Sequence, residues 1–379
     1  MNLFLLVLVG AAALTNGAAA PASVRPLVLT RWPAIGIQDV KVVDRYAYLV
    51  VDRSGFHVLD VSNPTNFSRV GGYTNVTSAY ISLTVVENYA YIADVHTGLH
   101  IIKISPATNC IRVGGYATAG QAHGVTVAGK YAYVADGLNG LEVIDIGNVT
   151  NCVRVGGYNT DGVAYAAAVA GNYAYVADQE AGLQVIDISN PINCVRVGGY
   201  DTEGSASDIL VSGNYAYVAD WYAGLQVVNV SNPTNCTRVG GYNTAGGASR
   251  LALQGDYVYI ADDFAGMVVI DVSNPTNCSL VSHYQHKGRG WVPGIAATID
   301  RTYVAESAGG LYALFSLRNV RSTILADATP GTPFTIEAAS GLSPADPWIP
   351  LLTTNVTFMP FKFVDFDVKP KKFYRIHQP

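Results

Sequence analysis

Five cysteines recur at a spacing of 42 residues, and they are the first side chains in this sequence whose type and spacing could do chemistry. These residues are Cys110, Cys152, Cys194, Cys236 and Cys278. In an oxidising compartment such a set suggests disulfides, and clustered thiolates could instead bind zinc. A disulfide needs Cα atoms within roughly 7 Å of each other, and identical positions in successive structural repeats lie farther apart. We therefore expect five free, mostly buried thiols and no metal site built from them.

Six acidic residues recur with the same period and could suggest calcium, which prefers carboxylate oxygens. These residues are Asp94, Asp136, Asp178, Asp220, Asp262 and Glu306. Each follows a short apolar run, where an aspartate more often accepts hydrogen bonds from turn amides. We therefore expect a structural role for them. No nucleophile elbow, P-loop or dinucleotide fingerprint stands in a suitable context, and no cofactor is expected.

The elements that position these side chains are repeats of about 42 residues. Six copies contain Y-A-Y or Y-V-Y, starting at Tyr46, Tyr89, Tyr131, Tyr173, Tyr215 and Tyr257. A divergent seventh copy starts at Arg301. Each copy holds four short segments rich in valine, isoleucine and tyrosine, separated by Gly, Asn and Pro, which predicts four strands, a to d. We therefore expect an all-β fold, a seven-bladed β-propeller, with a solenoid as the alternative.

The ends of the repeat region predict that the blades close into a ring. The seventh copy lacks its strand d, and the segment Pro26–Thr30 is a spare strand before the first blade. Antiparallel pairing of this segment with residues 310–317 would complete blade seven. It would also remove the unpaired sheet edges that are a hazard for β proteins.

Strands c and d of each blade are joined by N-P-x-N or an equivalent, and we expect these four residues to form the turn. Counting outward from this turn in blade four pairs Ser189 with Cys194 and Asp187 with Arg196. Opposite charges directly across antiparallel strands attract each other. The register therefore predicts an ion pair between Asp187 and Arg196.

The repeats resemble the LVIVD-repeat family of exported bacterial and archaeal proteins. The namesake motif appears as LQVIDIS at Leu183–Ser189, LEVIDIG at Leu141–Gly147 and MVVIDVS at Met267–Ser273. The resemblance covers roughly residues 24–318 and implies a β-propeller at the cell surface or outside the cell. The family carries no established reaction, so the resemblance implies no catalytic residue.

The sequence divides into an export signal at residues 1–22, the propeller at residues 23–320 and a C-terminal β module at residues 321–379. The signal is an apolar stretch, too short to span a bilayer comfortably, followed by small residues. A buried N-terminal strand is the alternative. The C-terminal module is similar to modules that end many exported bacterial proteins, and it is expected to be sandwich-like. Its expected strands are Phe334–Ser340, Trp348–Thr354, Phe361–Phe366 and Lys372–Ile376.

Charge and hydropathy limit the compartment and the partners. The formal net charge is -5, only 13% of the residues are charged, and there is no basic run outside the last dozen residues. Nucleic acid is therefore not an expected partner. No apolar run after the signal reaches transmembrane length. We expect a secreted, periplasmic or cell-surface protein that is monomeric.

The blades differ from one another mainly on one side. Because strands alternate in direction, the a–b and c–d turns share one face of the ring, and the b–c turns and d–a loops share the other. The first face repeats the same turn sequences, whereas the second, which we call the divergent face, carries varied aromatic and charged residues. Such loops on a regular scaffold indicate a binding face, with drift in unconstrained loops as the alternative. The candidate binding residues are Asp39, His96, His123, Tyr165, Glu180, Asp208, Trp221, Tyr222, Arg250, Asp263, Phe264, Arg289 and Trp291.

We therefore expect a non-enzymatic binding or scaffold protein whose divergent face engages a protein or a carbohydrate. The alternative is a glycan- or lactone-processing hydrolase with its site at the channel mouth. Such a site needs an acid, a base or metal ligands within hydrogen-bond reach of each other. The candidates for it are Asp39, His123, Asp208 and Arg250.

Overall fold

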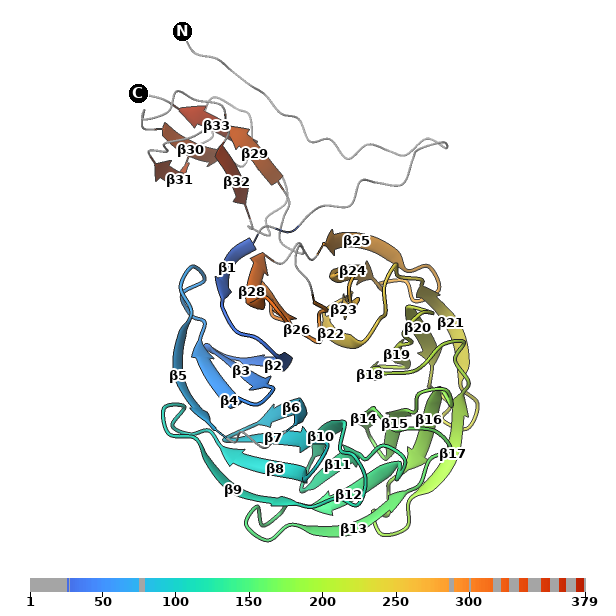
Figure 1. The fold of residues 1–379 in the computed structure, drawn as a ribbon. Coiled ribbons are helices and arrows are strands. Elements are labelled where there is room, and N and C mark those ends of the chain that lie inside the picture. The colour runs from blue at the N-terminus through green and yellow to red at the C-terminus, as the bar shows by residue number, and fades with distance from the viewer. Residues whose placement is uncertain are drawn as a thin grey trace. The chain divides into compact units, whose positions relative to one another are not determined.

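The computed structural model describes Pro26, residues 28–74, 79–285, 290–299 and 301–315, and five strands between residues 322 and 377. The chain contains two compact units, and one of them spans Ser23–Phe315. This unit is a ring of seven four-stranded sheets (Figure 1). The expected all-β, seven-bladed propeller is therefore confirmed.

Each blade runs from an innermost strand a to an outermost strand d. Blades one and two consist of β2 (Ile37–Val43), β3 (Tyr46–Val51), β4 (Gly55–Asp60) and β5 (Ser68–Tyr73), then β6 (Tyr80–Val86), β7 (Tyr89–Asp94), β8 (Gly98–Lys103) and β9 (Ile111–Tyr116). Blades three and four consist of β10 (Gly124–Ala128), β11 (Tyr131–Ala135), β12 (Leu141–Asp145) and β13 (Val153–Tyr158), then β14 (Ala166–Ala170), β15 (Tyr173–Ala177), β16 (Leu183–Asp187) and β17 (Val195–Tyr200).

The remaining blades follow the same order. Blades five and six consist of β18 (Asp208–Ser212), β19 (Tyr215–Ala219), β20 (Leu225–Asn229) and β21 (Thr237–Tyr242), then β22 (Arg250–Gln254), β23 (Tyr257–Ala261), β24 (Met267–Asp271) and β25 (Ser279–Tyr284). Blade seven consists of β26 (Gly294–Ala297), β27 (Arg301–Glu306), β28 (Gly310–Phe315) and, from the N-terminus, β1 (Val28–Trp32).

The N-terminal strand closes the ring. β1 pairs antiparallel with β28, so that Trp32 lies opposite Leu311 and Val28 opposite Leu314. The blue β1 lies beside the orange β28 in Figure 1. The innermost strands β2 and β26 of blades one and seven are also in contact. The predicted closure is therefore confirmed, with the strand starting two residues later than expected.

The hydrophobic core lies between neighbouring blades. At the junction of blades four and five, for example, Leu183 and Val185 of strand c pack with Ile209 and Val218 of the next blade. Within the described residues the buried side chains form seven such clusters. Strands covered on both faces need apolar side chains on both faces, which explains why the c strands are nearly continuous apolar runs.

In blades two to six, a cysteine of the c–d turn and a glycine of the preceding blade hold the turn against that blade. The Cys194 thiol donates to the carbonyl oxygen of Pro191, at 3.4 Å, and accepts a hydrogen bond from the N–H of Gly157 in blade three. The same carbonyl lies against Gly156. All five cysteines are free and buried or partly buried, and the other four repeat the thiol–carbonyl contact. The expected free, mostly buried thiols are confirmed.

This arrangement predicts the reactivity of the thiols. Burial raises the pKa of all five cysteines, and the thiol, unlike the thiolate, is a poor nucleophile. A thiol reagent at pH 7 should therefore label the folded protein slowly. It should label five groups after denaturation without a reductant. A denatured count of three or one would contradict this prediction, because it would require a disulfide.

Next to its turn, the c–d hairpin departs from the predicted register by one residue. A β-bulge between Val185 and Ile186 restores the predicted pairing from Val185 opposite Gly198 onward. Asp187 lies opposite Val195, and Ile186 lies opposite Arg196. The predicted ion pair between Asp187 and Arg196 is therefore wrong. The Asp187 carboxylate instead accepts a hydrogen bond from the N–H of Ser189, at 2.8 Å. Residues 188–194 form the loop between the paired Asp187 and Val195.

Arg196 has a structural role with a different partner. Its Nε donates to Oε1 of Gln184, and Nε2 of Gln184 donates to the carbonyl oxygen of Ala181 in the b–c turn, at 2.6 Å. Strand c thus links strand d to the b–c turn. The positions equivalent to Gln184 in blades one, two, three and five hold His57, His100, Glu142 and Gln226.

In the second unit, the described residues form five strands in two sheets. β30 (Phe334–Ala339) pairs with both β31 (Ile349–Thr354) and β33 (Phe373–His377), and β29 (Ser322–Ala326) pairs with β32 (Phe361–Asp365). Four of these strands fall in the expected segments, and β29 is additional. The sandwich-like arrangement stays a prediction. The expected export signal lies outside the described residues.

Candidate functional site

The b–c turns and d–a loops lie on one face, and in blades three to seven the b–c turn is bonded to the loop that enters the next blade. Gln179 in blade four pairs with Ala206, and Trp221 in blade five pairs with Ala248. On the other face the c–d turns bond the a–b turns, as in the hydrogen bond from the N–H of Ile188 to the carbonyl of Asn172. From blade three to blade seven, the divergent face is thus a row of paired loops.

The acidic residues that end the b strands hold these loops. Asp178 accepts hydrogen bonds from Thr160 Oγ1, at 2.5 Å, and from the N–H of Gly162, at 2.9 Å. Asp220 makes the equivalent contacts one blade further on. Burial raises the pKa of both carboxyl groups. The structural role expected for this series is confirmed at these positions. The described residues contain no cluster of three or more His, Cys, Asp or Glu side chains suited to a metal ion.

Four aromatic side chains stand on the divergent face over blades five to seven. Tyr222 is 79% exposed, Phe264 69% and Trp291 44%. The ring of Trp221 contacts that of Tyr222 with centroids 6.0 Å apart, and Phe264 contacts Trp291 at 6.5 Å. Large aromatic side chains left in water gain little from folding, and neighbouring ones are typical of interaction surfaces.

The backbone of three b–c turns adopts a left-handed conformation that favours glycine. The φ angle is 51° at Gln179, 44° at Trp221 and 48° at Asp263, and in blade three Gly137 takes the same position with φ of 61°. This conformation costs a non-glycine residue roughly 1–2 kcal/mol. Side chains that remain at such strained positions are often functional. This favours a binding role for these loops over random sequence drift.

The remaining outer candidates lie on separate blades. Glu180 is exposed and lines a shallow hollow of about 400 Å³ together with Leu138 and Asp161, from neighbouring loops of blades three and four. His96 is exposed in the b–c turn of blade two, and its N–H donates to Asp94. Arg289 lies outside the described residues.

His123 and Tyr165 stack at the inner ends of blades three and four. Their ring centroids are 4.5 Å apart and the rings are nearly parallel, at 11°. Burial lowers the pKa of His123, and the charge of Arg250 lowers it further. The imidazole therefore stays neutral near pH 7 and packs as an aromatic surface.

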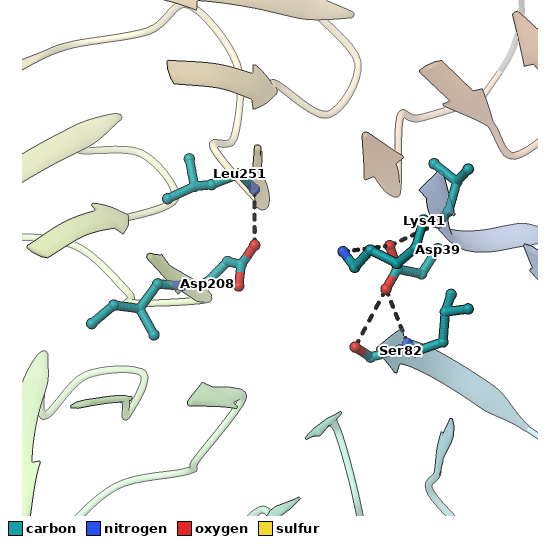
Figure 2. A network of polar contacts seen from close by, with 8 residues as sticks. Asp39, Lys41, Ser82, Asp208 and Leu251 are labelled. Atoms are coloured by element: carbon teal, nitrogen blue, oxygen red, sulfur yellow. Dashed lines mark hydrogen bonds and ion pairs between the residues drawn. The ribbon is translucent and has the colours of Figure 1, made fainter. Parts of the chain in front are cut away.

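Asp39 and Asp208 each connect their inner strand to that of the next blade (Figure 2). Asp39 Oδ2 accepts a hydrogen bond from the N–H of Leu83 in blade two, at 3.1 Å, and Asp208 Oδ2 accepts one from the N–H of Leu251 in blade six, at 2.8 Å. Asp39 is only 1% exposed. The structure therefore places its carboxylate in the junction between blades, where it is not available as a surface contact.

Two residues that the sequence analysis missed belong to the same network. Lys41 Nζ lies 3.5 Å from Asp39 Oδ1, and Ser82 Oγ donates to Asp39 Oδ2 at 3.4 Å. Lys41 could have been found from its position two residues after Asp39, on the same side of an inner strand. Ser82 carries no comparable signal, because a serine at the start of a strand is ordinary.

The four candidates for catalysis do not form an acid–base pair. Asp39 and Asp208 use their oxygens for amide, hydroxyl and ammonium donors. Within the described ranges, no hydrogen bond or ion pair joins any two of Asp39, His123, Asp208 and Arg250. A hydrolase would need at least one such contact, so the geometry does not favour it.

A protein-family model described as LVIVD repeat matches six segments of the chain, at residues 37–75, 81–118, 119–160, 161–202, 203–244 and 245–286. These segments correspond to the first six blades, and the seventh, divergent blade is not matched. A search of curated proteins found no match. In the described part of the chain, no helix has the length and apolar character needed to cross a membrane.

Solved structures share the fold at low sequence identity. The β-propeller domain of Cps50 (Swd1) from "Myceliophteria thermophila" is 10% identical, with a TM-score of 0.64, and the match covers 77% of this chain and 99% of that one. The RRP9 WD40 repeats are 12% identical, with a TM-score of 0.61 and coverage of 78% and 99%. The computationally designed protein Ika8 is 9% identical, with a TM-score of 0.56 and coverage of 76% and 99%. At such identities the likeness concerns the fold alone.

Proposed function

The chain belongs to the LVIVD repeat family, and on that basis we propose that it is a non-enzymatic binding or scaffold protein that acts outside the cytoplasm. Its divergent face engages a protein or a glycan. The observation that carries this proposal is the group of exposed aromatic side chains, Tyr222, Phe264 and Trp291, on loops that differ from blade to blade.

The contrast between the two faces supports binding on the divergent one. The turns of the opposite face form hydrogen bonds within themselves. Their asparagine side chains each accept one from a backbone N–H two residues further on, at Asn190, Asn232 and Asn274. That chemistry recurs from blade to blade and leaves little reason for a specific ligand. The rings of Tyr222, Phe264 and Trp291, in contrast, contact neighbouring aromatic rings and still remain exposed.

Action outside the cytoplasm is the second part of the proposal. It rests on the apolar segment at residues 1–22 and on the resemblance of the C-terminal region to modules of exported proteins. Free thiols are compatible with an oxidising compartment here, because the five cysteines stand on five different blades and are held in separate junctions.

The binding proposal predicts a large loss of ligand capture when the aromatic side chains are removed. The change is Trp221→Gly, Tyr222→Ala and Trp291→Ala, with glycine at position 221 because Gly137 makes the same turn in blade three. Truncating anchor residues of this kind costs about 2 kcal/mol or more each, so affinity should fall by more than 100-fold. The measurement is binding to the hits of a glycan array and a pull-down performed with the unaltered protein.

A matched change on the opposite face provides the control. Ile192 is 76% exposed in a c–d turn, and the equivalent positions in blades five and six hold Thr234 and Thr276. Ile192→Thr should therefore leave both folding and ligand capture unchanged. Loss of capture in Ile192→Thr, with capture retained in the triple variant, would place the binding site on the other face.

A further inference from the structure

The seven inner strands carry very few charges. Among their described residues only Asp39, Lys41, Asp208 and Arg250 are charged, and the other positions are apolar, hydroxyl or amide side chains or glycine. Two positive and two negative side chains therefore stand on strands that line the axis of the ring. Charges in such surroundings need a partner, either within the protein or in a ligand.

These charged groups belong to blades one, five and six, and the charges of Lys41 and Arg250 act on Asp208. Burial raises the pKa of Asp208, and the charges of Arg250 and Lys41 oppose that rise. Arg250 also acts on His123 of blade three. Figure 2 shows the Lys41 side chain extending from its strand toward the side that carries Asp208. The Lys41 ammonium therefore points into the axis, and the charge of Arg250 acts on Asp208 at the same inner strands.

Hydrogen bonding at the axis leaves donors in excess. The two carboxylates are occupied: Asp39 accepts from Val40, Leu83, Ser82 and Lys41, and Asp208 accepts from two backbone N–H groups. The cations have fewer partners. Lys41 makes one long contact of 3.5 Å to Asp39. The Arg250 guanidinium, which has five N–H donors, has no hydrogen bond or ion pair within the described residues.

We propose that Arg250 and Lys41 together bind an oxyanion, a carboxylate or a phosphate group, which the ligand of the divergent face inserts at the axis of the ring. The planar guanidinium presents two parallel donors that match such a group, and the ammonium adds a point charge. This inference deepens the proposed function and rests on it, because it names a chemical group of the ligand. A metal cation is not the expected occupant, because the carboxylate oxygens already have partners.

The surroundings suit an anion that arrives from solvent. The Lys41 side chain is 37% exposed, and Asp208 and Arg250 are partly exposed, so water and small solutes reach them. Burial raises the pKa of Asp208. The charge of Arg250 also acts on His123, which stacks on Tyr165.

The test measures binding of two small oxyanions, inorganic phosphate and D-glucuronate, to the full chain by calorimetry at low salt, with D-glucose as the uncharged probe. At least one oxyanion should bind with one site per chain, and glucose should not. Arg250→Ala should weaken that binding at least tenfold, and Lys41→Ala should weaken it as well. Alanine occupies the equivalent positions in blade four, Ala166 and Ala168, so both variants should fold.

The control removes a positive charge from the opposite face. Lys130→Ala breaks a surface contact with Asp145 and changes the net charge equally, so oxyanion binding should be unaffected. A higher affinity for phosphate would indicate that the ligand inserts a phosphate group, and a higher affinity for glucuronate would indicate a carboxylate. No binding of either probe, or binding that survives both Arg250→Ala and Lys41→Ala, would overturn the inference. Ligand capture that is lost in the aromatic triple variant and normal in Arg250→Ala would overturn it too, while the proposed function stands.

Discussion

Replacing Gly156 by alanine is expected to destabilise the propeller by about 3 kcal/mol or more, although it adds a single methyl group. An added Cβ at Gly156 would lie 1.9 Å from the carbonyl oxygen of Pro191 and 2.9 Å from its carbon. Both atoms are backbone of the neighbouring blade, so no side chain can rotate away. The c–d turn of blade four must move, and this movement strains the contact between the Cys194 thiol and the same carbonyl.

The measurement is the free energy of unfolding in urea, compared with that of Gly147→Ser. Gly147 stands in the c–d turn of blade three, and the equivalent position in blades four, five and six is Ser189, Ser231 and Ser273. This control should therefore change stability by less than about 0.5 kcal/mol. A Gly156→Ala protein as stable as the control would show that blades three and four are not in contact at this glycine.

The same close approach explains where the glycine repeat ends. Gly71, Gly114, Gly198 and Gly240 meet a carbonyl of the next blade's c–d turn in the same way, with an added Cβ 1.7–2.1 Å from its oxygen. Blade six has Ser282 at this position, and its neighbour, blade seven, takes its outer strand from β1. A glycine is needed only where a c–d turn follows. The exception in the sequence therefore reflects the way the ring is closed.

The architecture was predictable because seven copies of the repeat carry the same pattern of strands and turns. A fixed period, four short apolar segments per copy, one missing strand and one spare strand together leave few alternatives to a closed ring. Register was less predictable, because it depends on how much of a loop leaves the ladder. In the c–d hairpin of blade four, a β-bulge between Val185 and Ile186 shifts the pairs next to the turn by one residue, and the sequence does not distinguish a bulged ladder from a regular one.

The candidate site was predictable in part, and the limits have a physical cause. Repeat comparison identifies loops that vary, and so it correctly places Tyr222, Phe264 and Trp291 at exposed positions on the turns of blades five to seven. It cannot separate a varied residue that faces solvent from one that bonds the next blade, as Asp39 does. It also cannot show that the charge of Lys41 acts on Asp208, 167 positions away in the sequence.

Acid is expected to weaken this protein between about pH 6.5 and pH 4 through two buried histidines. His57 and His100 occupy one repeated position on strand c and are 6% and 3% exposed. Burial lowers the pKa of each to about 4, with the charges of Arg69 and Arg112 as the second cause. Their side chains bond the b–c turns through Ser54 Oγ and Thr97 Oγ1, and Nδ1 of each ring has no partner among the described residues.

The direction of the change in stability follows from comparing the protonation of the folded protein with that of the unfolded chain. Above pH 6.5 both states hold neutral histidines, so the full stability is present. As the pH falls from 6.5 toward 4, these histidines bind protons in the unfolded chain but not in the folded protein, so stability is lost. Below about pH 4 they are protonated in both states, and the loss levels off. A pKa that falls from 6.5 to about 4 corresponds to about 3 kcal/mol for each histidine. The two together approach the whole stability of an ordinary domain.

The repeat supplies a variant that isolates this effect. Gln184 and Gln226 hold the equivalent position in blades four and five, where each donates to a carbonyl of the b–c turn and accepts from an arginine of strand d. A His57→Gln, His100→Gln protein should fold and should lose much less stability than the unaltered protein between pH 6.5 and pH 4. Carboxyl groups that titrate in this range are common to both proteins, so they cancel in the difference. The exposed His96→Gln should behave like the unaltered protein. Parallel losses in all three proteins, measured by urea unfolding at several pH values, would mean that both buried histidines accept protons without opening the blades.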